Sequence, residues 1–97
     1  MRFYSTKDKE KLFSLSEAVL KGLPADNGLF MPERIPLLPE SFWKNISDYS
    51  FAEIADTVAS LYLSEDMPVE IIEQITREAM NFPVSVVQLD QQTHILE

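Results

Sequence analysis

The sequence predicts a small α+β domain with short strands at both ends and about three helices between them. Short segments rich in aromatic and β-branched residues lie near both termini, at 2–6 and 84–96, and are typical of strands. Apolar residues recur with helical spacing in the middle of the chain, most clearly over 51–63. Both glycines fall within the stretch 22–33, which separates the first predicted helix from the next extended segment.

The composition is that of one acidic domain without disulfides. The chain has 97 residues and no cysteine, and its 45% of apolar residues suffice for a modest core. The net charge of −8 lies in residues 50–97, because basic and acidic side chains cancel in residues 1–49. An acidic half repels phosphate backbones, so we expect no nucleic-acid partner. The absence of a long apolar run and of a signal-peptide pattern predicts a cytoplasmic protein with no membrane contact.

The first third of the chain is expected to form a strand, a charged connection and a helix. Residues 2–6 fit the strand, and residues 7–11 alternate in charge and are expected to be a solvated connection. Ser14 and Glu17 have the spacing of a capping box, which predicts a short helix ended by Gly22. The apolar side of this helix is expected to consist of Leu15, Val19 and Leu20, with Ala18 beside them.

Asp26, Asn27 and Gly28 are expected to form a tight turn. Asp and Asn bond to nearby backbone, and Asn and Gly adopt positive φ at low cost. A short apolar strand ended by Pro32 should follow. An ordinary helix–turn–strand connection and a functional loop both fit this pattern.

The middle of the chain is expected to be helical. Pro36 and Pro39 keep the preceding segment extended, and one helical turn should follow them, with Trp43 in the core. Ser50 and Glu53 predict a second capping box at the start of a helix over 51–63. Its apolar face would comprise Phe51, Ile54, Ala55, Val58, Leu61 and Tyr62.

A further helix is predicted to begin with Pro68 at its first position and to end before Phe82. Its buried stripe would comprise Ile71, Ile72, Ile75 and Ala79. Residues 84–89 and 93–97 should then form two strands joined by a turn at 90–92. Because the last strand pattern runs to Glu97, we expect the natural chain to continue and the 97 residues to be one domain of a larger protein.

The residues supply no catalytic constellation, so we assign no catalytic, cofactor-binding or metal-binding residue. His94 has no second histidine or cysteine with which to share a metal. The acidic pairs Glu17/Asp26 and Glu65/Asp66 are explained by capping and by charge near helix N-termini. None of the five lysines has the apolar sequence surroundings that lower the pKa of a Schiff-base lysine. A free-standing module that binds partners through its acidic half, 50–80, is one interpretation.

Several segments resemble the N-terminal region of threonine synthases. They are Phe3-Tyr4-Ser5-Thr6, the stretch from Ser14 to Leu23, Asp26-Asn27-Gly28-Leu29-Phe30-Met31-Pro32-Glu33, and Phe82-Pro83 followed by the two strands. The end of the chain, Ile95-Leu96-Glu97, is similar to the lead-in to that family's cofactor-lysine motif. Three places depart from the family pattern: Lys7-Asp8 replaces Arg-Gly, Pro24-Ala25 is inverted, and Asn27 replaces Gly.

The resemblance implies a pyridoxal-phosphate (PLP) enzyme that converts O-phospho-L-homoserine and water to L-threonine and phosphate. It also implies that the cofactor lysine and the phosphate-binding loop lie beyond Glu97, in a catalytic domain that would be the partner of this one. The 97 residues alone would then be catalytically incompetent and bind no PLP. From its turn chemistry, the segment Asp26, Asn27 and Gly28 is a candidate for a turn at the substrate entrance.

Overall fold

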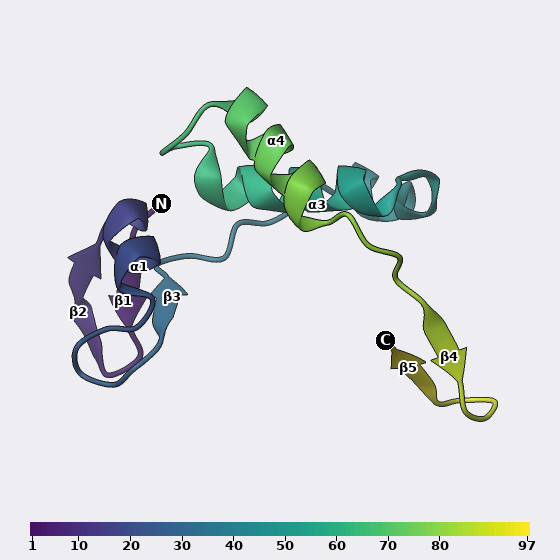
Figure 1. Cartoon of the computed structure of the whole chain (residues 1–97), viewed down its shortest axis with the longest axis horizontal. Helices are drawn as coiled ribbons and strands as arrows, with labels where there is room; N and C mark the ends of the chain where they lie inside the picture. The colour runs from purple at the N-terminus through teal and green to yellow at the C-terminus, as the bar shows by residue number, and fades with distance from the viewer.

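The computed structural model describes residues 1–97 and consists of three successive units (Figure 1). A small sheet with one helix is followed by a group of helices and then by a separate hairpin, which lies far from the sheet in the view of Figure 1. The elements are β1 Phe3–Ser5, β2 Asp8–Phe13, α1 Leu15–Lys21, β3 Phe30–Pro32, α2 Glu40–Lys44, a 3-10 turn Ile46–Asp48, α3 Phe51–Leu63, α4 Val69–Ala79, β4 Val86–Gln88 and β5 His94–Leu96. The predicted α+β class is confirmed.

The N-terminal sheet has the order β2-β1-β3, and both pairs are antiparallel. Tyr4 of the central strand lies opposite Leu12 on one side and Met31 on the other. The expectation that residues 7–11 form a connection is wrong, because most of this segment belongs to β2. The strand lies at the sheet edge and exposes its charged side chains. Backbone pairing with β1 therefore fixes its conformation, and Phe13 at its end is its only buried residue.

Helix α1 begins and ends as predicted. The capping box of Ser14 and Glu17 is present, and Gly22 ends the helix with φ of 67°. Its buried face consists of Leu15 and Ala18 only. The expected contribution of Val19 and Leu20 is wrong, since they are 70% and 84% exposed. A helix of two turns buries only one narrow stripe of side chains, and the side chains at neighbouring positions point toward solvent.

Helices α3 and α4 pack against each other. The second capping box, Ser50 with Glu53, starts α3 at Phe51. On α4 the buried residues are Ile72 and Thr76, which lie one turn apart. The rest of the predicted stripe, Ile71, Ile75 and Ala79, is exposed, and no residue of α3 is fully buried. Pro68 precedes α4 as its N-cap instead of occupying its first position.

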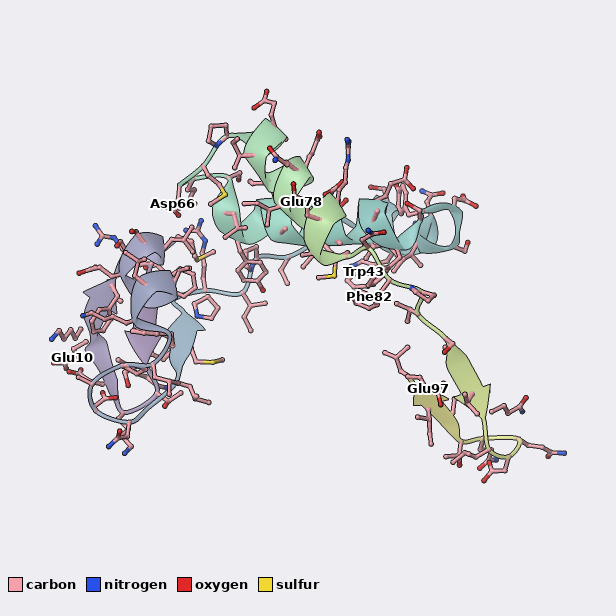
Figure 2. All side chains as sticks on the ribbon, in the orientation of Figure 1. Glu10, Trp43, Asp66, Glu78, Phe82 and Glu97 are labelled. Atoms are coloured by element: carbon pink, nitrogen blue, oxygen red, sulfur yellow. The ribbon has the colours of Figure 1, made fainter.

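The single tryptophan is not a core residue, contrary to the expectation. Phe42 is the buried residue of α2, where its ring stacks on Tyr49 with centroids 5.4 Å apart. Trp43 is 57% exposed and lies on the lower side of the helices in Figure 2. Successive helix positions differ in direction by about 100°, so Phe42 and Trp43 cannot both face the interior of so short a helix.

The C-terminal hairpin forms as predicted, with β4 and β5 antiparallel. The carboxylate of Asp90 accepts hydrogen bonds from the amides of Gln92 and Thr93, each at 2.8 Å, and this closes the turn. Every residue from 77 to 97 is exposed. The cross-strand pairs Val86/Leu96 and Val87/Ile95 lie on opposite faces of the ribbon, and both pairs face solvent.

The molecule is extended for its size. Its radius of gyration is 16.4 Å, whereas a compact domain of this length has about 13 Å. Its accessible surface is 7460 Å², compared with about 5,700 Å² for a compact monomer of the same mass. Only 10 of the 97 residues are buried, so the units share little core. The structure has no helix with the length and apolar character that crossing a bilayer requires.

Candidate functional site

The turn at Asp26, Asn27 and Gly28 is tied to the end of β1 by hydrogen bonds. The hydroxyl of Ser5, a fully buried residue, donates to Asp26 Oδ1 at 2.7 Å. The same oxygen accepts the Gly28 amide at 2.8 Å. Thr6 completes the junction, because its Oγ1 accepts the Leu29 amide and its own amide donates to the Leu29 carbonyl, each at 3.0 Å. The turn is therefore fixed to the sheet at both of its ends.

Asn27 and Gly28 have different roles in this turn. Asn27 adopts φ of 62°, the left-handed conformation that asparagine tolerates, as the sequence predicted. Gly28 does not have positive φ. A Cβ at position 28 would instead collide with Ser5 Oγ and lie 2.9 Å from Asp26 Oδ1. Glycine is therefore needed at 28 because the backbone passes directly over the buried serine.

The same junction forms one wall of a small polar cavity of about 180 Å³. It lies between the β1–β2 pair, the end of α1 and the turn. Its lining residues are Ser5, Asp8, Lys11, Phe13, Lys21, Pro24, Ala25 and Asp26. The sequence pointed only to Asp26 among them. The others were missed because β2 was taken for a connection, and no local motif indicates that β2 and the end of α1 meet.

Two lysines meet at one aromatic ring of this cavity. Lys11 Nζ lies 5.4 Å and Lys21 Nζ 5.0 Å from the centroid of the Phe13 ring. Cations at these distances are attracted by the negative face of an aromatic ring. Neither ammonium group takes part in a salt bridge of this structure. The cavity thus carries two positive charges that no carboxylate of the chain neutralises by direct contact.

Hydrogen bonds order both carboxylates of the cavity, and those of Asp26 favour its ionised form. The Ser5 hydroxyl, followed by the Gly28 amide, lowers the pKa of Asp26 below its ordinary value of 3.8. Asp8 Oδ1 accepts hydrogen bonds from the amides of Glu10 at 3.1 Å and Lys11 at 3.3 Å. Both carboxylates therefore use one oxygen to order backbone and accept no hydrogen bond from the chain on the other.

The pair Glu65/Asp66 has a different role from the predicted one. Instead of only placing charge near a helix N-terminus, these carboxylates contact the amino group of Met1, at 2.5 and 3.1 Å. Glu65 also pairs with Arg34. Hydrogen bonds from the Met1 amino group, then from Arg34, lower the pKa of Glu65. These contacts join the sheet unit to the helices, and Figure 2 shows Asp66 on the side of the helices nearest the sheet.

The residues of this chain do not fit a PLP site. A Schiff-base lysine needs a desolvated position, whereas all five lysines are exposed. No atom lies within 4 Å of the position that a Cβ of Gly22 would take, and the space beside Gly28 is occupied by Ser5. Neither glycine therefore belongs to a phosphate-binding loop. His94 lies exposed on β5. No group of three or more acidic or histidine side chains could hold a metal ion.

Comparison with known proteins identifies the family. The family described as "Threonine synthase N terminus" matches residues 2–80. The chain belongs to that family. Threonine synthase of Schizosaccharomyces pombe is 49% identical over 61 residues, which are 63% of this chain and 12% of that protein. Threonine synthase of Corynebacterium glutamicum is 34% identical over 88 residues, 86% of this chain and 18% of that protein.

A solved threonine synthase shares the fold over the full chain. The crystal structure of threonine synthase from Escherichia coli matches with a TM-score of 0.86 and 28% identity, over 100% of this chain and 23% of that one. The chain thus spans less than a quarter of the length of these threonine synthases. The family assignment agrees with the resemblance of the Ser14–Leu23 and Asp26–Glu33 segments.

Proposed function

We propose that this chain is the N-terminal domain of a cytoplasmic, PLP-dependent threonine synthase, a lyase of threonine biosynthesis. The complete enzyme would convert O-phospho-L-homoserine and water to L-threonine and phosphate, with PLP stabilising the carbanions of the reaction. The observation that carries the proposal is the match of the whole chain to 23% of the E. coli enzyme at a TM-score of 0.86. Since the present residues do not fit PLP, the cofactor lysine would belong to a catalytic domain after residue 97.

The exposed apolar surface supports a role as a domain that packs against a larger one. The accessible surface exceeds that of a compact monomer of equal mass by about 1,800 Å². Stable protein–protein interfaces bury about 800 Å² on each partner, so the excess is large enough for an obligate interface. We propose that this surface contacts the catalytic domain of the same polypeptide, because the related threonine synthases are four or more times as long as this chain.

The hairpin would be one part of that interface. An isolated two-stranded ribbon is marginally stable in water, and this one exposes Val86, Val87, Ile95 and Leu96. Its edges carry unpaired backbone groups that could pair with further strands. Covering both faces would therefore stabilise the hairpin and remove apolar surface from water.

An apolar groove between the sheet unit and the helices would be a second part. Its lining includes Leu15 and Val19 of α1 and Leu63, Met67 and Ile75 of the helical unit. The groove has a volume of about 510 Å³, which is enough for several side chains of a packed partner. The exposed positions of Val19 and Ile75, unexpected in a free domain, are then explained by contact with the catalytic domain.

The decisive experiment compares the 97-residue chain with the protein encoded by the complete gene. With PLP and O-phospho-L-homoserine, we expect the longer protein to release phosphate and form threonine, and the 97-residue chain to do neither. Titration of the 97-residue chain with PLP should give no saturable absorbance change. A gene that stops after Glu97, or saturable PLP binding by the short chain, would contradict the proposal. The first outcome would favour the acidic interaction module.

A further inference from the structure

The amino group of Met1 lies at the junction between the sheet unit and the helices. Met1 is a buried residue, and no part of its side chain is exposed. Its nitrogen lies 2.5 Å from Glu65 Oε2 and 3.1 Å from Asp66 Oδ2, in the connection between α3 and α4 (Figure 1). Hydrogen bonds from an ammonium group to carboxylates are charge-assisted and stronger than neutral ones. The first residue is thus bound to side chains 64 and 65 positions further along the chain.

The neighbouring residues fix the position from which Met1 reaches these carboxylates. The amide of Arg2 donates to Glu33 Oε1 at 3.0 Å, and its carbonyl accepts the Glu33 amide at 2.9 Å. These two bonds hold Arg2 against the residue that follows β3. Arg34, the next residue, pairs with Glu65. The ion pairs of Met1 and Arg34 are the polar contacts that join residues 1–34 to the helices.

The contacts of Met1 require an unmodified ammonium group. Hydrogen bonds to Glu65, then to Asp66, raise the pKa of the Met1 amino group above its ordinary value of 8.0, so it carries its charge at neutral pH. An ammonium group has three N–H donors, which allows it to serve both carboxylates. Acylation removes the charge and leaves a single N–H. The acyl group would also need room beside a residue that is already buried.

We propose that the free α-amino group of Met1 is the docking group that holds the sheet unit on the helices, and that an acyl group on this nitrogen releases the sheet unit. Formyl and acetyl are the smallest groups of this kind. After acylation, Glu65 and Asp66 would retain Arg34 as their one cationic partner among these contacts. The proposal rests on the contacts of Met1 and not on the proposed function. Its test uses neither PLP nor substrate, so failure would leave the proposed function untouched.

The experiment compares the 97-residue chain with a free and with an acetylated α-amino group. Solid-phase synthesis provides both, because the lysine side chains remain protected while the terminal amine is acetylated. Trp43, the single tryptophan, is exposed on α2 and serves as the energy donor. A dansyl group on the variant Lys9→Cys serves as the acceptor on exposed β2, since the chain has no other cysteine. Time-resolved energy transfer then reports the distribution of distances between the two units.

Two controls separate the proposed contact from a general effect of charge. In the first, Nε-acetyl-lysine at the exposed position Lys7 removes the same charge from the sheet unit without touching Met1. In the second, acetylation of Met1 is repeated in the double variant Glu65→Gln/Asp66→Asn, which already lacks both anionic partners. Far-UV circular dichroism of every chain reports whether the helices and strands remain folded.

We expect a narrow distribution for the chain with the free amine. Acetylation of Met1 should lower the ratio of docked to released molecules by about threefold or more, with an unchanged circular dichroism spectrum. Acetylation of Lys7 should have no effect, and the double variant should give a broad distribution that acetylation of Met1 does not alter. Identical distributions for the free and acetylated chains would overturn the proposal. So would an equal response to acetylation in the double variant, or a loss of helical signal on acetylation.

Discussion

Replacing Gly28 with alanine should destabilise the chain through steric overlap, chiefly with the buried Ser5. The added Cβ would overlap Ser5 Oγ and lie 2.9 Å from Asp26 Oδ1 and 3.0 Å from Thr6 Oγ1. Ser5 is fully buried and hydrogen-bonded, so it cannot move aside without losing its bond to a carboxylate. Overpacking of this kind costs about 1–3 kcal/mol. Backbone conformation adds nothing, because Gly28 does not have positive φ.

A double-mutant cycle distinguishes the steric explanation from general damage. Ser5→Ala alone should cost about 1.5–3 kcal/mol, the contribution of a hydrogen bond to a charged group. It also removes the atom with which the new methyl collides. The double variant Ser5→Ala/Gly28→Ala should therefore lose less than the sum of the two single losses, by about 1–3 kcal/mol.

The assay is urea unfolding of each variant followed by far-UV circular dichroism, and Gly22→Ala is the control. Gly22 has φ of 67° and no atom within 4 Å of the position that a Cβ would take, so alanine there should cost about 1–2 kcal/mol through backbone strain alone. That loss should add to the Ser5→Ala loss without coupling. Strict additivity of Gly28→Ala with Ser5→Ala would refute the reasoning.

Three further predictions concern the turn, the helix pair and the acidic contact to the first residue. Asn27→Val places a β-branched residue at φ of 62° and should cost about 1–2 kcal/mol in urea unfolding, whereas Asn27→Gly should change little. If the turn borders the substrate entrance, as its sequence predicts, Asn27→Val should also lower turnover of the complete enzyme. Unchanged stability and unchanged turnover would show that the turn is unimportant. Ile72→Ala removes a side chain that is 0% exposed and should lower the free energy of unfolding by about 2–5 kcal/mol. The same change at Ile75, which is 45% exposed, should cost less than half as much. Equal losses of stability would contradict the assignment of the buried face. The pKa of Glu65 is lowered by its bonds to the Met1 amino group and Arg34, so the unfolded chain binds more protons in acid than the folded chain does. The stabilisation from Glu65 is complete above the ordinary pKa of 4.5 and is lost as pH falls through the folded value. Glu65→Gln should therefore flatten the acid side of a stability–pH profile.

Local signals in the sequence were sufficient to predict the features that are formed by hydrogen bonds between residues a few positions apart. The two capping boxes, the positive φ of Asn27 and the Asp90 turn all depend on a side chain and backbone less than four positions away. Helix α3 was predicted to the residue because its start is capped and its apolar period is regular. Such features need no knowledge of what packs against them.

Strand β2 and the cavity could not be predicted in this way. The charged run at 7–11 has no strand pattern, and only pairing with β1 makes it extended. The cavity brings together Lys11 from β2, Lys21 from α1 and Asp26 from the turn, and their meeting depends on how three separate elements fold onto β1. The spacing of these residues along the sequence does not show that they lie close together in space.

The sequence by itself determined the family, the α+β class, the limits of helices α1 and α3, and the Asp26–Gly28 turn. The tertiary structure decided which apolar side chains are buried. Periodicity marks a face about 100° wide or more, but which residues of that face are covered depends on the partner: Ile72 packs in the helix pair, while Ile75, on the same predicted stripe, faces an open groove. Burial is a relation between two surfaces, and one strand or helix contains only one of them.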